Sequence, residues 1–131
     1  MDNRIGRSGR VFKTAWFSKA AKKAHIADEE LCSAIQRVML GQADDLGGGV
    51  FKKRLNRNMY RSIIVAKGGR YWIYVYLFAK KDRANIHDDE LVNFRGVADL
   101  YARKTEADIA KEMQLRELAE ICYEEKSQIQ E

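Results

Sequence analysis

The spacing of apolar residues divides the chain into segments of strand and of helical periodicity. Val11 and Phe12 are the apolar members of a short predicted strand at residues 10–14. Alanines and Phe17, at helical spacing, then predict a helix at residues 16–24. The periodic part of the chain therefore begins with a strand that is followed at once by a helix.

The second predicted helix has the clearest pattern in the chain. Asp28 suits its N-cap, Glu29 and Glu30 suit the positive end of the helix dipole, and Gly41 suits its end. A loop over residues 42–49 follows, and it ends in a flexible turn of three glycines. The apolar stripe of this helix consists of Leu31, Ile35, Val38 and Met39.

From residue 50 the period becomes that of β-strands. Residues 50–56, 60–66 and 71–78 are separated by the turn sequences 56–58 and 67–70, so they predict an antiparallel meander. The third strand is apolar on both faces, which is typical of a strand in the middle of a sheet. Strict alternation places Tyr71, Ile73, Val75 and Leu77 on one face and Trp72, Tyr74, Tyr76 and Phe78 on the other.

Helical periodicity returns after residue 86. Asp88 suits the N-cap of one helix, and Thr105 with Asp108 fits the capping box of another. The fold class is therefore α+β: an N-terminal strand and two helices, then a three-stranded antiparallel meander that completes one sheet, with additional C-terminal helices. The first of these helices carries Leu91, Phe94, Ala98 and Tyr101, and the last carries Leu115, Leu118, Ala119 and Cys122.

The length of 131 residues is that of a single domain, residues 1–131. Residues 1–9 form a loose leader, and residues 104–131 are expected to form an acidic helical C-terminal extension. No apolar run is long enough to span a membrane or to serve as a signal peptide. Cys32 and Cys122 fit neither a disulfide framework nor a metal site, so we expect reduced thiols in a cytoplasmic protein.

Charge is distributed unevenly along the chain. Residues 1–86 hold 18 Lys and Arg against 7 Asp and Glu, a formal charge of +11, whereas residues 87–131 hold 6 against 12, a charge of −6. Such asymmetry suggests a body that faces a polyanion, joined to an acidic segment. The alternative is a set of solvated helices that happen to differ in charge.

The densest basic cluster lies in the first predicted hairpin, with Lys52, Lys53, Arg54, Arg57 and Arg61. Alternation puts Lys52 and Arg54 on one strand face, and Arg61 of the partner strand can stand beside them. Three cations on one face repel one another unless an anion lies over them, which favours a phosphate site. The alternative is an edge strand that its charge protects from aggregation.

A second basic cluster, Lys80, Lys81 and Arg83, follows the end of the third strand. That end should lie near the basic hairpin, so both clusters can border one groove. His87 follows beside these cations and could act as a general acid or base near neutral pH. The alternative is a surface histidine at the start of a helix.

Aromatic residues of the meander offer a surface for base stacking. Tyr60 and Phe78 lie near the expected basic rim, although aromatic residues of a central strand usually belong to the core. The sequence has no His, Cys, Asp and Glu set at metal-ligand spacing and no nucleophile elbow. We therefore expect neither a metal nor a cofactor.

Several sequence runs together resemble the HigB-like branch of the RelE/ParE toxin superfamily. The resemblance covers about residues 11–103 and is specific in combination, since each run alone is weak. The runs are FKTAWF (residues 12–17), IADEELC (26–32), DLGGGV (45–50), KKR (52–54), YR (60–61), FAKKDRANI (78–86) and DEL (89–91).

This resemblance implies a small α+β toxin encoded with a HigA-like helix-turn-helix antitoxin. Relatives cleave mRNA on the ribosome without a metal, and the 2′-hydroxyl attacks its own phosphate to leave a 2′,3′-cyclic phosphate and a 5′-hydroxyl. The same fold includes ParE-type inhibitors of DNA gyrase, and a non-catalytic nucleic-acid-binding module is a further alternative.

Basic pattern and resemblance together assign the site residues. The expected catalytic residues are Lys52, Arg54, Arg61, Arg83 and His87. The expected RNA-binding residues are Lys53, Arg57, Tyr60, Lys80 and Lys81.

Overall fold

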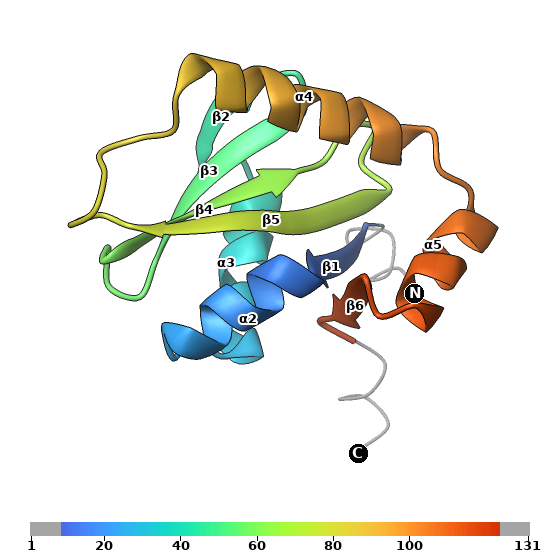
Figure 1. Ribbon diagram of the computed structural model, residues 1–131, viewed down its shortest axis with the longest axis horizontal. Helices are drawn as coiled ribbons and strands as arrows, with labels where there is room; N and C mark the ends of the chain where they lie inside the picture. The colour runs from blue at the N-terminus through green and yellow to red at the C-terminus, as the bar shows by residue number, and fades with distance from the viewer. Residues whose placement is uncertain (1–8, 124–131) are drawn as a thin grey trace.

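A computed structural model describes residues 9–123, which fold into one six-stranded sheet with helices on both faces (Figure 1). Residues 1–8 of the expected leader and residues 124–131 lie outside the described part. The strands are β1 (Arg10–Thr14), β2 (Asp44–Gly47), β3 (Val50–Leu55), β4 (Tyr60–Val65), β5 (Tyr71–Ala79) and β6 (Leu118–Ile121). The helices are α2 (Ala15–Lys23), α3 (Asp28–Met39), α4 (Asp88–Ala102) and α5 (Glu106–Gln114).

The α+β prediction is confirmed, and β1, β3, β4 and β5 lie within one residue of their expected bounds. The strand order is β2-β3-β4-β5-β1-β6. The meander β3-β4-β5 is antiparallel, and β1 runs parallel to β5 through four residue pairs from Arg10↔Tyr71 to Lys13↔Tyr74. Because β1 ends there and the chain turns into α2, no strand of the described residues lies on that side of the second half of β5.

Two cores lie on opposite faces of the sheet. Helices α2 and α3 cover one face, where Phe17, Leu31 and Tyr74 are fully buried. The Tyr74 hydroxyl donates to the Leu31 carbonyl oxygen at 2.7 Å, and burial raises the pKa of this phenol. Helices α4 and α5 cover the other face, where Ile73 and Ile109 are buried. None of the helices within residues 9–123 is long and apolar enough to cross a membrane.

A β-bulge interrupts the alternation of β5. Ile63 of β4 pairs with Tyr76, but the next residue, Ile64, pairs with Tyr74. Val75 is therefore the extra residue of the bulge, and it shifts every later side chain of β5 to the opposite face.

The expectation that Trp72, Tyr74, Tyr76 and Phe78 share one face is consequently wrong. Trp72 and Tyr74 pack with α2 and α3, whereas Tyr76 and Phe78 belong to the core beneath α4. Local sequence does not reveal the bulge, because the strand is apolar on both sides of it.

The expected loop over residues 42–49 contains the edge strand β2, which pairs antiparallel with β3. Its residues are mostly exposed, so no apolar alternation marked it. The glycine turn is confirmed, and Gly47, Gly48 and Gly49 all have positive φ. The Arg95 side chain lies against this turn, with its guanidinium donating to the carbonyl oxygens of Leu46 (2.5 Å) and Gly47 (3.2 Å).

The expected helix over Leu115, Leu118, Ala119 and Cys122 is wrong. Helix α5 ends at Gln114, and Leu118–Ile121 is the strand β6, which pairs antiparallel with β1. This segment forms a strand because it pairs with the open edge of β1. Leu118 and Ile121 lie in the cores on opposite faces of the sheet, as alternation along a strand requires.

The helix starts were predicted with mixed success. The capping box of α5 is confirmed, because the Asp108 amide donates to Thr105 Oγ1 (3.1 Å) and the Thr105 amide donates to Asp108 Oδ2 (2.9 Å). The N-cap of α3 is Ala27 rather than Asp28, whose carboxylate instead pairs with Lys13 at 2.7 Å. The N-cap of α4 is His87 rather than Asp88.

Cys32 and Cys122 form a disulfide, so the expectation of reduced thiols is wrong. The two residues are 90 positions apart in sequence, yet their Cα atoms are 5.4 Å apart. The pairing of β6 with β1 brings residue 122 beside α3, a long-range effect that cysteine spacing does not encode.

Arg10 joins β1 to the acidic C-terminal segment. Its guanidinium binds Glu120 of β6 at 2.8 and 2.9 Å and Glu106 of α5 at 2.6 Å. The hydrogen bond to Glu120 is the main reason that the pKa of Arg10 is raised. Part of the negative charge after residue 86 thus neutralises a cation at the start of the chain.

We predict that loss of the disulfide destabilises the fold. A Cys32→Ser/Cys122→Ser variant should lose about 2–5 kcal/mol of unfolding free energy, because the bond restricts a long loop of the unfolded chain. Urea unfolding measures this loss. As a control, a reductant should lower the wild-type midpoint to that of the variant and leave the variant unchanged; equal midpoints throughout would contradict the prediction.

Candidate functional site

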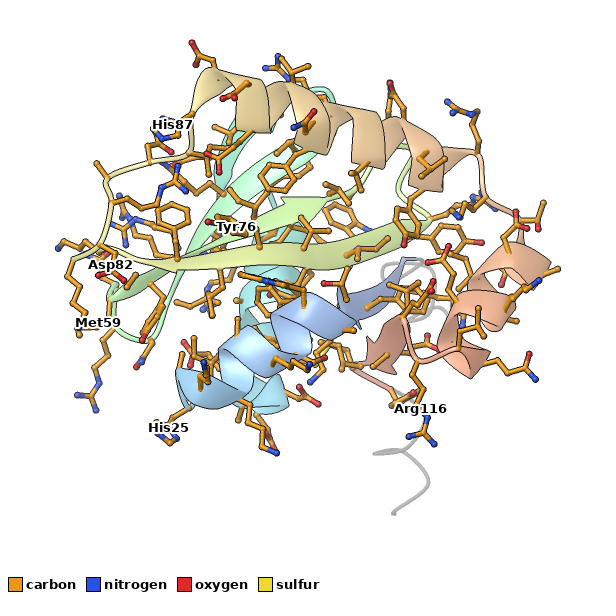
Figure 2. All side chains as sticks on the ribbon, in the orientation of Figure 1. His25, Met59, Tyr76, Asp82, His87 and Arg116 are labelled. Carbon is orange, nitrogen blue, oxygen red and sulfur yellow. A yellow bond between two sulfur atoms is a disulfide. The ribbon has the colours of Figure 1, made fainter. Side chains whose placement is uncertain are left out.

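Cations from β3, β4 and the loop after β5 gather at one end of the sheet, on the face that α4 covers. Val50 of β3 is buried beneath α4, so Lys52 and Arg54 face the same side. Arg54 lies directly opposite Arg61 across the β3–β4 pair. We call Lys52, Arg54, Arg61 and Arg83 the basic site; Figure 2 shows the labelled Tyr76 and His87 toward the same end.

Arg83 is held in place by neighbours on both the strand and the helix. Its guanidinium binds the two oxygens of Glu90 at 2.6 and 3.2 Å and the Tyr76 hydroxyl at 3.1 Å. Its Nε donates to the carbonyl oxygen of Asn85 at 3.0 Å, and its guanidinium carbon lies 5.5 Å from the centre of the Phe78 ring. Arg83 is therefore fixed above the last residues of β5, where the bulge has placed Tyr76 and Phe78.

The remaining cations differ in how far they are neutralised. Lys52 Nζ lies 3.3 Å from Asn85 Oδ1 and 3.8 Å from Asp44 Oδ2. Arg61 donates to the carbonyl oxygen of Asn58 at 2.9 Å. The Arg54 guanidinium makes no hydrogen bond to any residue in the range 9–123. No carboxylate in that range pairs with Arg54 or Arg61, so these two adjacent guanidiniums can bind an anion without first losing an ion pair.

Glu90 links the basic site to the start of α4. Its Oε1 accepts both from Arg83 and from the backbone amide of His87, the latter at 2.7 Å. The hydrogen bond from Arg83, with that from His87, lowers the pKa of the Glu90 carboxyl to about 2. Glu90 is therefore ionised near neutral pH and orients Arg83, while His87 and the Tyr76 hydroxyl are the neighbouring groups that can exchange a proton.

All five expected RNA-binding residues lie outside the basic site, and three of them lie at separate places. Lys53 faces the α3 side, where its Nζ donates to the carbonyl oxygen of Gln42 at 2.8 Å; burial, with Arg37 and Arg54 nearby, lowers its pKa. Arg57 is exposed in the β3–β4 turn, where its φ is positive. Lys80 is exposed just after β5.

Tyr60 and Lys81 line a cavity of about 450 Å³ that Arg83 and Trp16 also line. The Trp16 ring, 51% exposed, stacks on Tyr76 with a centroid distance of 5.1 Å. An exposed aromatic ring beside cations is an arrangement that binds single-stranded nucleic acid.

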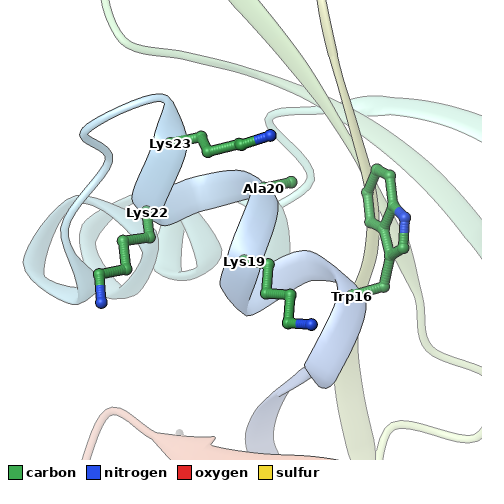
Figure 3. A pocket seen from close by; sticks show the side chains of 5 residues that line it. All are labelled: Trp16, Lys19, Ala20, Lys22 and Lys23. Atoms are coloured by element: carbon green, nitrogen blue, oxygen red, sulfur yellow. The ribbon is translucent and has the colours of Figure 1, made fainter.

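A second cavity, of about 570 Å³, lies along α2 and is also lined by Trp16 (Figure 3). Lys19 and Lys23 border it, and Lys23 lines both cavities. Helix α2 therefore adds positive charge around the indole. The sequence pattern gave these helix residues no functional role.

Four residues beside the basic site escaped the sequence-based assignment. Tyr76 was assigned to the wrong face because the bulge has no local signal, and Trp16 was assigned to a helix without a role. Asn85 carries no signal of its own. Glu90 was missed because Asp88 was expected to be the N-cap, whereas a capping box that starts at His87 has its acid at residue 90.

No group of three or more His, Cys, Asp or Glu side chains within residues 9–123 could hold a metal ion. Besides the carboxylate of Glu90, the side chains that lie at this end of the sheet carry guanidinium, ammonium, imidazole and phenol groups. Such groups bind phosphate and can transfer protons.

The family model described as the RelE toxin of the RelE/RelB toxin-antitoxin system matches residues 9–121. This range includes every strand and helix of the described fold. No curated protein matches the chain.

We predict that the Arg83–Glu90 pair makes stability depend on pH. Because the folded pKa of Glu90 is about 2, against an ordinary value of 4.5, the pair stabilises the fold above pH 4.5 and this contribution is lost as the pH falls toward 2. At pH 6 wild type should therefore unfold at a higher temperature than Glu90→Gln. This difference in unfolding temperature should disappear as the pH falls to 2.

Asp82→Asn provides the matched control, because Asp82 is an exposed acid of the same loop whose carboxylate makes no hydrogen bond or ion pair in the described chain. Thermal unfolding of the three proteins across the pH range is the measurement. A gap between wild type and Glu90→Gln that is independent of pH would contradict the prediction.

Proposed function

The chain belongs to the RelE toxin family, and from this premise we propose that it is a ribosome-dependent mRNA endoribonuclease that inhibits translation. The observation that carries the proposal is the pair Arg54 and Arg61, adjacent across two strands and without a carboxylate partner in the described chain. We further propose that the protein is of the HigB type and acts in the cytoplasm, where mRNA is translated.

The proposed reaction is an internal transesterification. The 2′-hydroxyl oxygen of a ribose attacks the adjacent phosphorus, and the bond from phosphorus to the 5′-oxygen of the next nucleotide breaks. A base takes the proton from the 2′-hydroxyl, and an acid gives a proton to the departing 5′-oxygen. The products are a 2′,3′-cyclic phosphate and a 5′-hydroxyl.

The basic site supplies what the transition state of this reaction needs. Negative charge grows on the phosphoryl oxygens as the phosphorus becomes five-coordinate, and fixed cations stabilise that charge more than they stabilise the ground state. We assign this role to Lys52, Arg54, Arg61 and Arg83. Glu90 is a positioning residue, because it fixes the Arg83 guanidinium.

We assign proton transfer to His87, which lies at the N-terminus of α4. Its place is supported by Glu90, whose Oε1 accepts hydrogen bonds from both the His87 amide and Arg83. The RNA strand on either side of the scissile phosphate would contact Arg57, Lys80, Lys81 and Tyr60. A base would stack on Trp16, beside Tyr60. Lys53 would contact the RNA at a small cavity of about 240 Å³, which Lys52 and Arg54 also line.

We predict that removing one guanidinium or ammonium of the basic site slows cleavage. Lys52→Ala, Arg54→Ala and Arg61→Ala should each lower the rate on translated mRNA by a factor on the order of 10²–10³, because each removes a preorganised stabiliser of phosphoryl charge. Primer extension on translated mRNA measures the loss of new 5′ ends.

Arg116→Ala is the matched control, since it removes the same charge far from the basic site (Figure 2). It should cleave as wild type does. Full cleavage by all three basic-site variants, with folding verified by circular dichroism, would overturn the mechanism. Filamentation with DNA damage in place of translation arrest would instead indicate a ParE-like gyrase inhibitor.

We also propose a HigA-like helix-turn-helix antitoxin as partner, supported by membership in a toxin-antitoxin family. Co-expression with the product of the adjacent gene should restore growth to induced cells, and the two proteins should purify together. A product that neither restores growth nor binds this chain would contradict the proposal.

A further inference from the structure

The outer side of α4 carries a line of exposed residues with a regular pattern. Their spacing of three or four positions keeps them within about 40° of one line along the helix, over about 21 Å. We call them the α4 stripe. It consists of Asp89, Val92, Gly96, Leu100 and Arg103.

The middle of the stripe is apolar, where a solvated helix face would be polar, and its two ends carry opposite charges. Val92 is 63% exposed and Leu100 is 47% exposed. The opposite side of the same helix packs on the sheet through Phe94, Val97 and Ala98, so α4 is apolar on two sides. In Figure 1, α4 is the outermost layer on its face of the sheet, and no described element lies outside it.

Gly96 marks the centre of the stripe and is not explained by packing within the chain. A glycine in the interior of a helix weakens it relative to alanine. A Cβ atom at this position would meet no heavy atom within 4 Å among the described residues. The missing side chain therefore leaves room for something outside the chain to approach the helix backbone closely.

The stripe is complementary to itself when a second copy is turned end for end. With the two Gly96 residues together, Val92 faces Leu100 of the second copy and Asp89 faces its Arg103, because each pair is spaced evenly about position 96. A parallel arrangement would instead put Asp89 against Asp89. Antiparallel helices also oppose their dipoles favourably.

We propose that two copies of this chain associate through antiparallel contact of their α4 stripes, with Gly96 at the two-fold axis. The contact is isologous, as two-fold interfaces are. Because each α4 begins beside a basic site, the two basic sites lie toward opposite ends of the helix pair. The inference does not depend on the proposed ribonuclease activity.

The interface is small, so the dimer should be weak, with a Kd on the order of 10–100 µM at low salt. Sedimentation equilibrium of the full chain from 1 to 500 µM measures it. Wild type should shift from monomer to dimer over this range, and the shift should weaken at higher salt, which screens the Asp89–Arg103 pairs.

Charge reversal provides the decisive test. Asp89→Arg and Arg103→Asp should each dimerise at least ten-fold more weakly than wild type, because each alone opposes like charges. An equimolar mixture of these two variants should form a heterodimer, since both of its charge pairs are then opposite. The double variant should dimerise as wild type does.

Two further variants separate docking from folding. Gly96→Gln should be at least as resistant to heat as wild type, because it removes a glycine from a helix, yet it should not dimerise. Arg116→Asp, a charge reversal away from α4, should leave dimerisation unchanged. Wild type that stays monomeric at 500 µM, or single variants that stay apart when mixed, would overturn the proposal.

Discussion

The β-bulge at Val75 determines which face of the sheet the side chains of each half of β5 occupy. Before it, the strand is enclosed by β4 on one side and β1 on the other, and Tyr74 enters the core beneath α2 and α3. After it, the strand has lost β1, and Tyr76 and Phe78 appear on the α4 face. Arg83 rests on both of these residues. A regular strand would turn them to the opposite face and leave Arg83 without that support.

The uneven charge of the chain becomes clearer once its ion pairs are located. Acids after residue 86 neutralise cations at several places: Glu106 and Glu120 bind Arg10, Asp99 binds Lys67, and Glu90 binds Arg83. Arg54 and Arg61 receive no such partner in the described chain. The acidic segment thus neutralises cations elsewhere in the described chain, while Arg54 and Arg61 at the centre of the basic site keep their positive charge.

What the sequence predicted well was local. Alternation defined the meander and placed Lys52, Arg54 and Arg61 on one face, and the Thr105–Asp108 capping box was read correctly. What it predicted poorly depends on partners far along the chain. The strand β6 exists because β1 has an open edge, and the Cys32–Cys122 bond follows from that pairing. Trp16 and Tyr76 meet only because α2 leaves the sheet beside the second half of β5.

The place of β1 in the sheet has a consequence for the order of events during synthesis. β1 is the first strand of the described chain, yet its two neighbours in the sheet, β5 and β6, are the last two. The described sheet therefore cannot be finished until β6 has been made, and Cys32 cannot pair with Cys122 before then. Contacts between such distant parts of a chain slow folding. In a newborn copy, β1 therefore has both edges open until the strands that flank it have been made.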